Sequence, residues 1–575
     1  MFRKSDSTSE QSLFSNIRNF LTGNALKIYE KEEGWHNQFR KQVVERIDET
    51  IFRPLFSSGQ GAPNASIRVL IGMMLLKEAH NWSDSQLFDH CKFNLLVRSA
   101  LGLLNLDDAV PVPSTYYLLR QRIVSYETET QENLLETVFS QVTGAQALDF
   151  EISGKQIRMD SKLMGSNIAW YSRYELIHET LCQAYHSLKD AVCFSFTESD
   201  LQLLGSVCGE SGNKVCYRSN KSEIESRLAE LGVLIYKIIC QSGDYQTDAL
   251  CTLRRVFDEQ YLIDLDVVTA RPKTEISAQS VQSPHDPDCH YRQKGDKEVK
   301  GYSVNVCETC VPDNAVNLIT NVSVEAASAA DCDFLQPAVE ATATIVTGNI
   351  ETINADGAYH SVENQEFCNE NKIDLIIGAI QGKASQYDLS LDENGDLTVT
   401  DLHTNATIIP RKLKPDKKTG KSKWAIDTGK KNKYRYFTQK EIDTCSLRKK
   451  ISARTKEELN VRNNVEASIF QLGYHYSNSK SRYRGLIKHK IWANLRCLWI
   501  NFVRILKCTA SGGFSCIKKA NKSRFFRNFY VKNYEILFNF VYFLNYFQFW
   551  IKTEKKLSFV DNYCIDFSEN KIFEK

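Results

Sequence analysis

Apolar residues recur at helical spacing through much of the first 150 positions. One clear stripe consists of Val69, Leu70, Met73, Met74 and Leu76. This spacing predicts an amphipathic helix. Positions 81–84 predict a turn in which Ser83 caps the next helix, and Ser114, after two prolines, is predicted to cap another. Residues 1–148 are therefore expected to form a helical N-terminal domain.

Short helices joined by tight turns have two interpretations. They suit a helix-turn-helix-like unit that binds DNA, and they equally suit a small helical bundle that only packs. The pattern alone favours neither, so both remain open.

Strand patterns begin near residue 150. Ile157, Met159 and Ser161 alternate onto one face, which leaves Asp160 on the other. A helix is predicted over about 331–347. Further strands are predicted at 301–306, 315–320, 352–355 and 374–380. This order predicts an α/β fold with a mixed sheet flanked by helices.

Two insertions interrupt this pattern within a second predicted domain of 149–508. Residues 175–285 are expected to be helical, and residues 385–450 to be β-rich and basic, because apolar positions alternate there. Late helices are predicted over about 455–475 and 485–507. Residues 509–575 form an atypical tail rich in Phe, Tyr, Asn and Lys.

Composition narrows the class of protein only broadly. The 575 residues carry a net charge of +2, with 25% charged and 42% hydrophobic residues, as in ordinary globular proteins. The 17 cysteines follow no disulfide framework and no secretory leader is evident, so a cytoplasmic location is expected. The most apolar run, 536–551, is shorter than the roughly 20 residues of a membrane span, so no membrane partner is expected.

Two aspartates stand at positions where a metal site can form. Phosphodiester chemistry needs charge stabilisation on the attacking and leaving oxygens, which two divalent cations about 4 Å apart supply. Magnesium prefers oxygen ligands such as carboxylates. Asp160 lies in a predicted strand and Asp356 closes another. Strand-end aspartates are also common in turns, and each aspartate taken alone favours that alternative.

A third carboxylate comes with more context. Arg462 and Glu466 are four residues apart and share a helix face, beside an apolar stripe that would bury the helix against a sheet. The simpler alternative is a solvated ion pair. A basic, aromatic-rich stretch follows, which suits contact with phosphates. Its cations include Lys480, Arg482, Arg484, Lys488 and Lys490.

A second basic stretch spans Arg411 to Arg435 and holds eleven Lys and Arg residues against two aspartates. Its centre, with Lys417, Lys418 and Lys421, is predicted to be an exposed hairpin tip. A solvated loop is the alternative. DNA contact is favoured because the loop lies between Asp356 and Glu466 in the chain.

Other candidate ligands and bases carry less weight. Cys307 and Cys310 form a lone cysteine pair without the four ligands of a structural zinc site, so no zinc is expected. His290 and His360 are interpreted as structural or substrate-adjacent, because metal-assisted chemistry needs no histidine.

Four segments resemble the motifs of DDE transposases of bacterial insertion sequences. Residues 158–170 resemble the first-aspartate region, and 354–360 resemble the second-aspartate motif with its glycine and tyrosine. Residues 283–294, with Lys300–Tyr302, resemble the family's intervening strand region. Arg462 and Glu466 resemble the third motif. The resemblance covers about residues 40–507.

Two positions depart from the family's third motif. Leu459 stands where many relatives carry a tyrosine, and Gly473 stands where many carry a lysine. Lys480, seven residues further on, is expected to serve instead of that lysine.

The resemblance implies a ribonuclease-H-like core in which Asp160, Asp356 and Glu466 are catalytic and hold two Mg²⁺ or Mn²⁺ ions. It implies that the N-terminal helices bind terminal inverted repeats, that Arg462 and the basic stretches contact DNA, and that a homodimer joins two ends in a synaptic complex. By the same resemblance, water would attack the phosphodiester at the element's end and leave a 3′-hydroxyl. That hydroxyl would then attack target DNA. Both steps are expected to take place at the nucleoid.

Two other functions remain open. One is a catalytically decayed or repurposed sequence-specific DNA-binding protein, which the tail keeps open because it leaves the family pattern after about residue 510. The other is a simple nuclease, which would cut DNA without strand transfer.

Overall fold

A computed structural model describes most of the chain, which divides into two compact units, Met1–Ala510 and Ser511–Lys575. The described residues are 1–5, 14–57, 59, 61–265, 267–380, 382–383, 385–392, 396–413, 422–428, 434–476, 479–510, 563–566 and 571–574.

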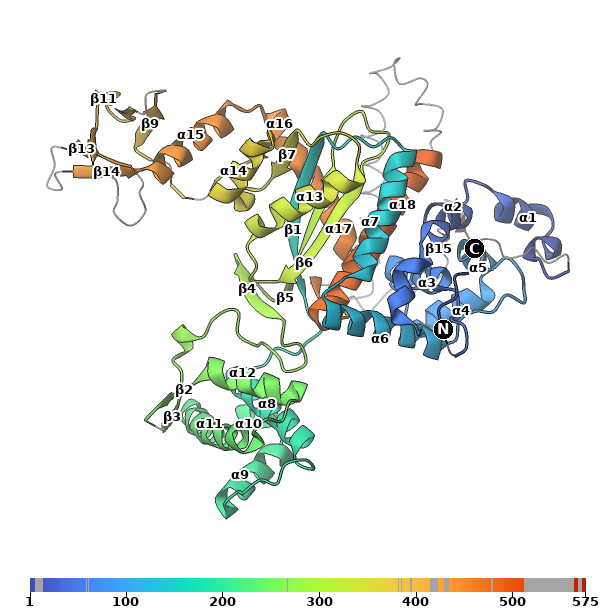
Figure 1. Ribbon diagram of the computed structural model, residues 1–575, viewed down its shortest axis with the longest axis horizontal. Coiled ribbons are helices and arrows are strands. Elements are labelled where there is room, and N and C mark those ends of the chain that lie inside the picture. The colour runs from blue at the N-terminus through green and yellow to red at the C-terminus, as the bar shows by residue number, and fades with distance from the viewer. Residues whose placement is uncertain are drawn as a thin grey trace. The chain divides into compact units, whose positions relative to one another are not determined.

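A mixed sheet of six strands lies within the first unit (Figure 1). Its order is β4-β5-β1-β7-β8, and β6 also pairs with β5. β1 (Gln156–Gly165) runs antiparallel to β5 (Lys297–Thr309) and parallel to β7 (Thr352–Ala355). The other strands are β4 (His290–Lys294), β6 (Ile319–Ala326) and β8 (Asp374–Ile377). The prediction of an α/β fold with a mixed sheet is confirmed.

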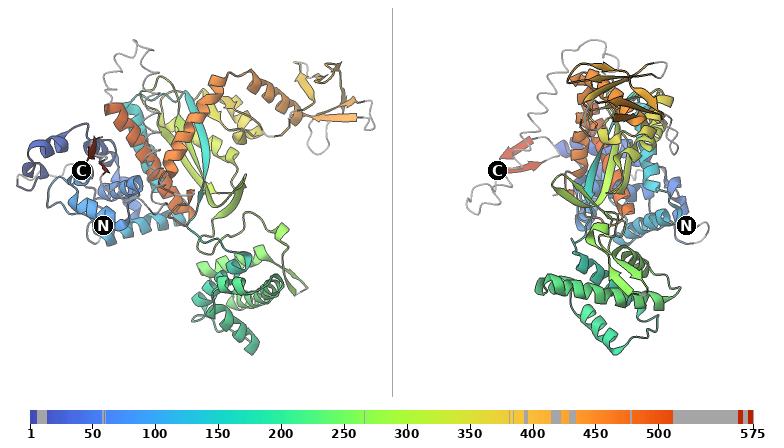
Figure 2. Two further views of the ribbon diagram at one scale, coloured as in Figure 1. Left: turned by 180° about the vertical axis from the view of Figure 1, so that it is seen from behind. Right: turned by 90° about the vertical axis from the view of Figure 1, so that its left-hand side faces the viewer.

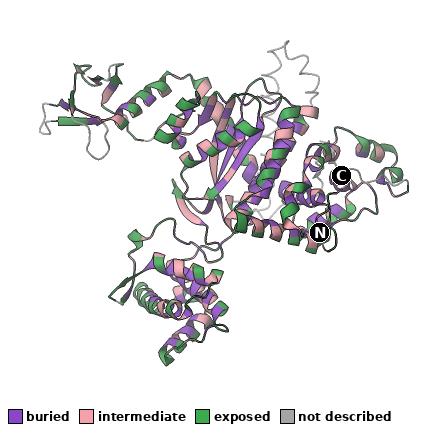
Figure 3. Ribbon diagram, viewed as in Figure 1, coloured by how far each residue is buried: buried purple, intermediate pink, exposed green. Residues whose placement is uncertain are grey.

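Alternation along β1 gives this sheet two different faces. Ile157 and Met159 pack in one hydrophobic cluster with residues of α13 (Leu335–Ile345) and α14 (Val362–Glu370). The opposite face, with Val304 and Val306 of β5, packs with α17 (Val465–Gly473) and α18 (Leu486–Ala510). Figure 2 shows these two helices against the strands, and Figure 3 shows how deeply the strands are buried. Because side chains alternate along a strand, Asp160 lies on the α17 face.

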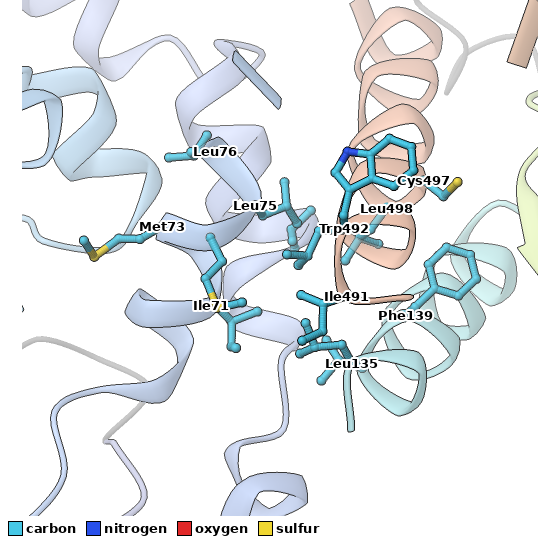
Figure 4. Packing of buried hydrophobic residues seen from close by; sticks show 14 of the residues in the cluster. Ile71, Met73, Leu75, Leu76, Leu135, Phe139, Ile491, Trp492, Cys497 and Leu498 are labelled. Carbon is cyan, nitrogen blue, oxygen red and sulfur yellow. The ribbon is translucent and has the colours of Figure 1, made fainter. Parts of the chain in front are cut away.

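The N-terminal helices share one hydrophobic core with that face of the sheet. Residues of α3, α7 and α18 interlock there (Figure 4), and strands β5 and β6 contribute to the same cluster. Twelve of the fourteen residues of α3 are buried, so this helix packs on nearly every side. The helices are α1 (Gly23–Glu30), α2 (Trp35–Gln42), α3 (Ile67–His80), α4 (Asp84–Phe93), α5 (Leu95–Ala100), α6 (Pro113–Thr130) and α7 (Leu134–Asp149).

The helical segment after β1 has a hydrophobic core of its own, which extends from Tyr174 to Val281. Its longest helix, α11, has the leucine and isoleucine spacing expected of a helix that is buried along one stripe. The elements are α8 (Arg173–Leu188), α9 (Glu198–Gly209), α10 (Gly212–Arg218), α11 (Lys221–Ser242), α12 (Asp248–Gln260), β2 (Tyr261–Asp264) and β3 (Val267–Ala270).

The basic insertion forms two small antiparallel sheets around Trp424 and Phe437. Its strands are β9 (Tyr387–Leu391), β10 (Leu397–Asp401), β11 (Thr407–Ile408), β12 (Arg411–Leu413), β13 (Lys423–Asp427) and β14 (Tyr434–Thr438). Then come α15 (Gln439–Ala453), α16 (Lys456–Asn460) and the 3-10 helix η7 (Val461–Asn464).

The described part of the second unit is one antiparallel pair, β15 (Tyr563–Asp566) and β16 (Lys571–Glu574). The apolar run 536–551 lies outside the described residues. Among the residues that are described, no helix has both the length and the apolar character to cross a membrane.

Three local predictions are wrong, each for a physical reason. The helix α6 begins at Pro113 with Val112, not Ser114, as its N-cap. Proline is tolerated at the first helical position because the N–H that it lacks would have no partner in the first turn. The strand expected at 315–320 begins at Ile319, because Asn314 and Asn317 bond to loop carbonyls instead.

The helix expected over 455–475 is broken into α16, η7 and α17. The guanidinium of Arg158 donates to the carbonyl oxygen of Val461 at 3.1 Å. A side chain therefore bonds to a carbonyl that would otherwise accept a backbone hydrogen bond within the helix. Asn460, Asn463 and Asn464 also favour local bonds over a continuous helix.

Glu127 of α6 should make stability depend on pH. Its side chain is 5% exposed, its nearest cation is Lys490 at 4.0 Å, and its Oε2 has no hydrogen-bond partner among the described residues. Burial raises the pKa of Glu127 from 4.5 to about 7. The folded protein then binds the proton more tightly than the unfolded chain, so stability is lost as pH rises from about 4.5 to 7.

We expect the free energy of unfolding of Glu127→Gln, measured with urea, to exceed that of wild type by up to about 3 kcal/mol at pH 8. At pH 4.5 the two proteins should be nearly equally stable. Glu129→Gln, at an exposed position on the same helix, is the control. An equal effect of Glu127→Gln at both pH values would contradict the assignment.

Candidate active site

Asp160 and Asp356 come from neighbouring parallel strands in matching register. β1 pairs with β7 as Gln156 with Thr352 through Arg158 with Asn354. The same offset, continued two residues, sets Asp160 beside Asp356. Each carboxylate accepts a hydrogen bond from the next backbone N–H, 2.8 Å from Ser161 and 2.7 Å from Gly357.

The two aspartates differ in exposure. The side chain of Asp160 is 16% exposed, whereas that of Asp356 is 42% exposed. Burial raises the pKa of Asp160, while the backbone N–H of Ser161 and the charge of Arg462 act against that rise. A carboxylate in such a place gains stability from a nearby cation.

The segment η7–α17 lies across the strand that carries Asp160. Arg158 and Lys162 flank Asp160 on the same face of β1, and both reach this segment through its backbone. Arg158 donates to the carbonyl of Val461, and the Nζ of Lys162 donates to the carbonyl of Ile469 at 3.3 Å. These two bonds bracket Glu466.

One guanidinium contacts all three predicted carboxylates. Nitrogen atoms of Arg462 lie 3.1 Å from Asp356 Oδ1, 3.7 Å from Asp160 Oδ2 and 3.9 Å from Glu466 Oε1. Glu466 is the most open of the three, with its side chain 68% exposed. The three carboxylates that the sequence singles out therefore surround a single cation.

The donor set suits a hard divalent ion. All three groups are carboxylates, the oxygen ligands that Mg²⁺ prefers. As they stand, the His, Cys, Asp and Glu side chains of the described residues include no group of three close enough to share one ion. In this arrangement the three carboxylates lie 3.1 to 3.9 Å from nitrogen atoms of Arg462, which supplies the positive charge at this place.

A buried ionic cluster next to the site connects the strands and helices that carry these carboxylates. Glu308 of β5 stands opposite Arg158 of β1, and its side chain is fully buried. Its carboxylate lies 2.6 Å from Arg158, 2.7 Å from Arg504 of α18 and 2.6 Å from the Ser468 hydroxyl of α17. Burial alone would raise the pKa of Glu308, but Arg504 and Arg158 hold it below its ordinary value.

Sequence reasoning missed this cluster. The available signal is a lone carboxylate inside the apolar strand segment 304–310, since a buried charge requires a partner. A further missed group is Asp331, which accepts a hydrogen bond from Ser161 at 2.9 Å and pairs with Arg292 at 3.4 Å.

Apart from Arg462, the predicted DNA-contacting residues fall into three groups. Lys480, Arg484 and Lys488 are exposed. Arg482 instead turns inward, bonding to the carbonyl of Trp82 at 2.9 Å and pairing with Glu78 at 3.3 Å. Lys417, Lys418 and Lys421 lie outside the described residues.

The remaining candidates have structural surroundings. His290 is bonded to the hydroxyl of Ser328 at 2.7 Å, and His360 is half-buried, which lowers its pKa. Cys307 and Cys310 are buried at the end of β5. Asn354 donates to the sulfur of Cys310 at 3.8 Å.

Two family comparisons identify the class of protein. Residues 28–122 match the family described as Transposase domain (DUF772), and residues 263–502 match the family described as Transposase DDE domain. The chain belongs to the DDE transposases of insertion sequences.

Other comparisons add little. No curated protein matches the sequence. A cryo-EM structure of the piggyBac transposase synaptic complex with hairpin DNA is similar with a TM-score of 0.26 and 8% identity, over 87% of this chain and 83% of that one. A TM-score this low does not show a shared fold.

Loss of the Glu308 charge should destabilise the fold. Glu308→Gln leaves two inward-facing arginines without their carboxylate, which typically costs about 3–5 kcal/mol. Ser468→Ala removes one hydrogen bond to a charged group and should cost about 1.5–3 kcal/mol. Urea unfolding of both variants measures these losses.

Glu325→Gln provides the matched control, because Glu325 is exposed on β6 of the same sheet. Its effect should stay within about 0.5 kcal/mol. If Glu308→Gln proves as stable as this control, the cluster does not hold the elements together.

Proposed function

We propose that this transposase binds the terminal inverted repeats of its own element and catalyses metal-dependent cleavage and strand transfer, with Asp160, Asp356 and Glu466 as catalytic residues. The observation that carries the proposal is the contact of all three carboxylates with Arg462. The sheet would be a ribonuclease-H-like core, which its two adjacent aspartate-bearing strands support.

Two Mg²⁺ or Mn²⁺ ions would be held by these three carboxylates. When bound, the ions would stabilise charge on the attacking and leaving oxygens of the phosphodiester. The protein's own contribution is to fix the strands through their register and the third carboxylate through the bonds of Arg158 and Lys162.

Exposed cations after the third carboxylate would contact DNA phosphates. Lys480, Arg484 and Lys488 are exposed, which supports this role, although Lys480 donates to the carbonyl of Ile168 and Arg484 to that of Asn167. Arg462 and Arg482 belong to the same proposal, although both are engaged within the protein here. The basic insertion would contribute through Lys417, Lys418 and Lys421.

The joining of two element ends would require two copies of the chain. We therefore also propose that the protein forms a homodimer in a synaptic complex and acts on chromosomal DNA in the cytoplasm. The helices of residues 1–148 would bind the repeats.

Replacement of Asp160 should abolish cleavage and leave DNA binding intact. In Asp160→Asn, a fragment carrying the element's ends should be cut at least about 1,000-fold more slowly with Mg²⁺, because several kcal/mol of transition-state stabilisation are lost at 1.36 kcal/mol per tenfold. A gel-shift assay on the same fragment should give unchanged affinity.

Asp374→Asn is the control, since Asp374 begins β8, at the end of the strands away from Asp356, and pairs with Arg454. It should cut normally. Normal cleavage by Asp160→Asn would exclude the carboxylate assignment.

Strand transfer separates a transposase from a simple nuclease. With a pre-cut element end and supercoiled target DNA, the wild-type protein should join the two, and Asp160→Asn should not. Cleavage without any joining would support the nuclease instead.

A further inference from the structure

We propose that Arg462 is the counter-cation of the carboxylate site in the DNA-free protein, and that it must leave the site before divalent ions bind. The proposal rests on the function proposed above and adds a step to it. DNA binding and metal loading would be coupled through one side chain.

The contacts of Arg462 are those of an exchangeable cation. Only the nitrogen at 3.1 Å from Asp356 is within hydrogen-bond range, and the other two carboxylates lie at 3.7 and 3.9 Å. Its Nε is buried without a hydrogen-bond partner among the described residues. Strong arginine–carboxylate pairs are shorter and bidentate, so this guanidinium is held mainly by charge.

The neighbouring arginine shows the contrast. Arg158 lies 2.6 Å from Glu308 and also donates to the carbonyl of Val461. That second bond anchors the backbone directly before Arg462. The side chain of Arg462, which is 22% exposed, can therefore move while its backbone stays in place.

A DNA phosphate is the natural competitor for this guanidinium. Arginine binds phosphate with the same fork of donors that it offers a carboxylate. Removal of Arg462 leaves three carboxylates without their shared cation, which strengthens the attraction for a divalent ion. By thermodynamic reciprocity, bound ions would in turn release Arg462 toward DNA.

The test measures metal binding without catalysis. Mn²⁺ is titrated into the DNA-free full-length protein, and the free ion is followed by electron paramagnetic resonance. Arg462→Gln should bind Mn²⁺ at least about tenfold more tightly than wild type, since a charge next to the site is removed. Arg462→Lys, which keeps the positive charge, should restore most of the weak wild-type affinity.

The matched control is Lys294→Gln. The charge of Lys294 acts on Asp160 from an exposed position, but no ion pair between them is present among the described residues. Its removal should change Mn²⁺ affinity by less than about twofold, because exposed charges are screened. An equal gain in Lys294→Gln and Arg462→Gln would show a general charge effect and overturn the proposal.

A second comparison separates this proposal from the proposed function. In the double variant Asp160→Asn with Arg462→Gln, tight Mn²⁺ binding should be lost. If the double variant still binds tightly, the ions sit elsewhere and the carboxylate site itself fails. If Asp160→Asn weakens binding but Arg462→Gln has wild-type affinity, only the role of Arg462 fails.

Addition of a short duplex oligonucleotide completes the test. The duplex should tighten Mn²⁺ binding to the wild-type protein and should have little further effect on Arg462→Gln. Equal tightening of both proteins would mean that DNA acts without displacing Arg462, which contradicts the coupling.

Discussion

The buried pairing of Glu308 with Arg158 and Arg504 determines how the candidate site is assembled. It joins β5, β1 and α18, and the Ser468 hydroxyl adds α17. Ser468 lies two residues after Glu466, and Arg158 lies two residues before Asp160. The ionic cluster thus fixes the spacing between the first and third carboxylates, although none of its members belongs to the predicted catalytic set.

Much of the sheet could be predicted from sequence because it depends on local alternation. The faces of β1 and the short strand before Asp356 follow directly from residue pattern, and both agree with the structure. The break at η7 could not be predicted, because it depends on a bond from Arg158, some 300 residues away in the chain. The inward turn of Arg482 similarly depends on Glu78 of α3, which no local pattern reveals.

The candidate site was predictable in its members but not in its central contact. Arg462 and Glu466 share a face by spacing, yet the approach of Arg462 to both aspartates requires the register of β1 and β7 and the path of η7. The roles of these residues stay predictions, as do the domain limits at 148 and 508.

The distribution of hydrophobic cores has a consequence for how such a chain can change in evolution. The segment from Tyr174 to Val281 buries its apolar residues among themselves. It could lengthen, shrink or be exchanged by recombination without exposing the sheet. The N-terminal helices offer no such freedom, because α3 and α7 bury the same surface as β5, β6 and α18. A graft at that junction would have to replace both sides together.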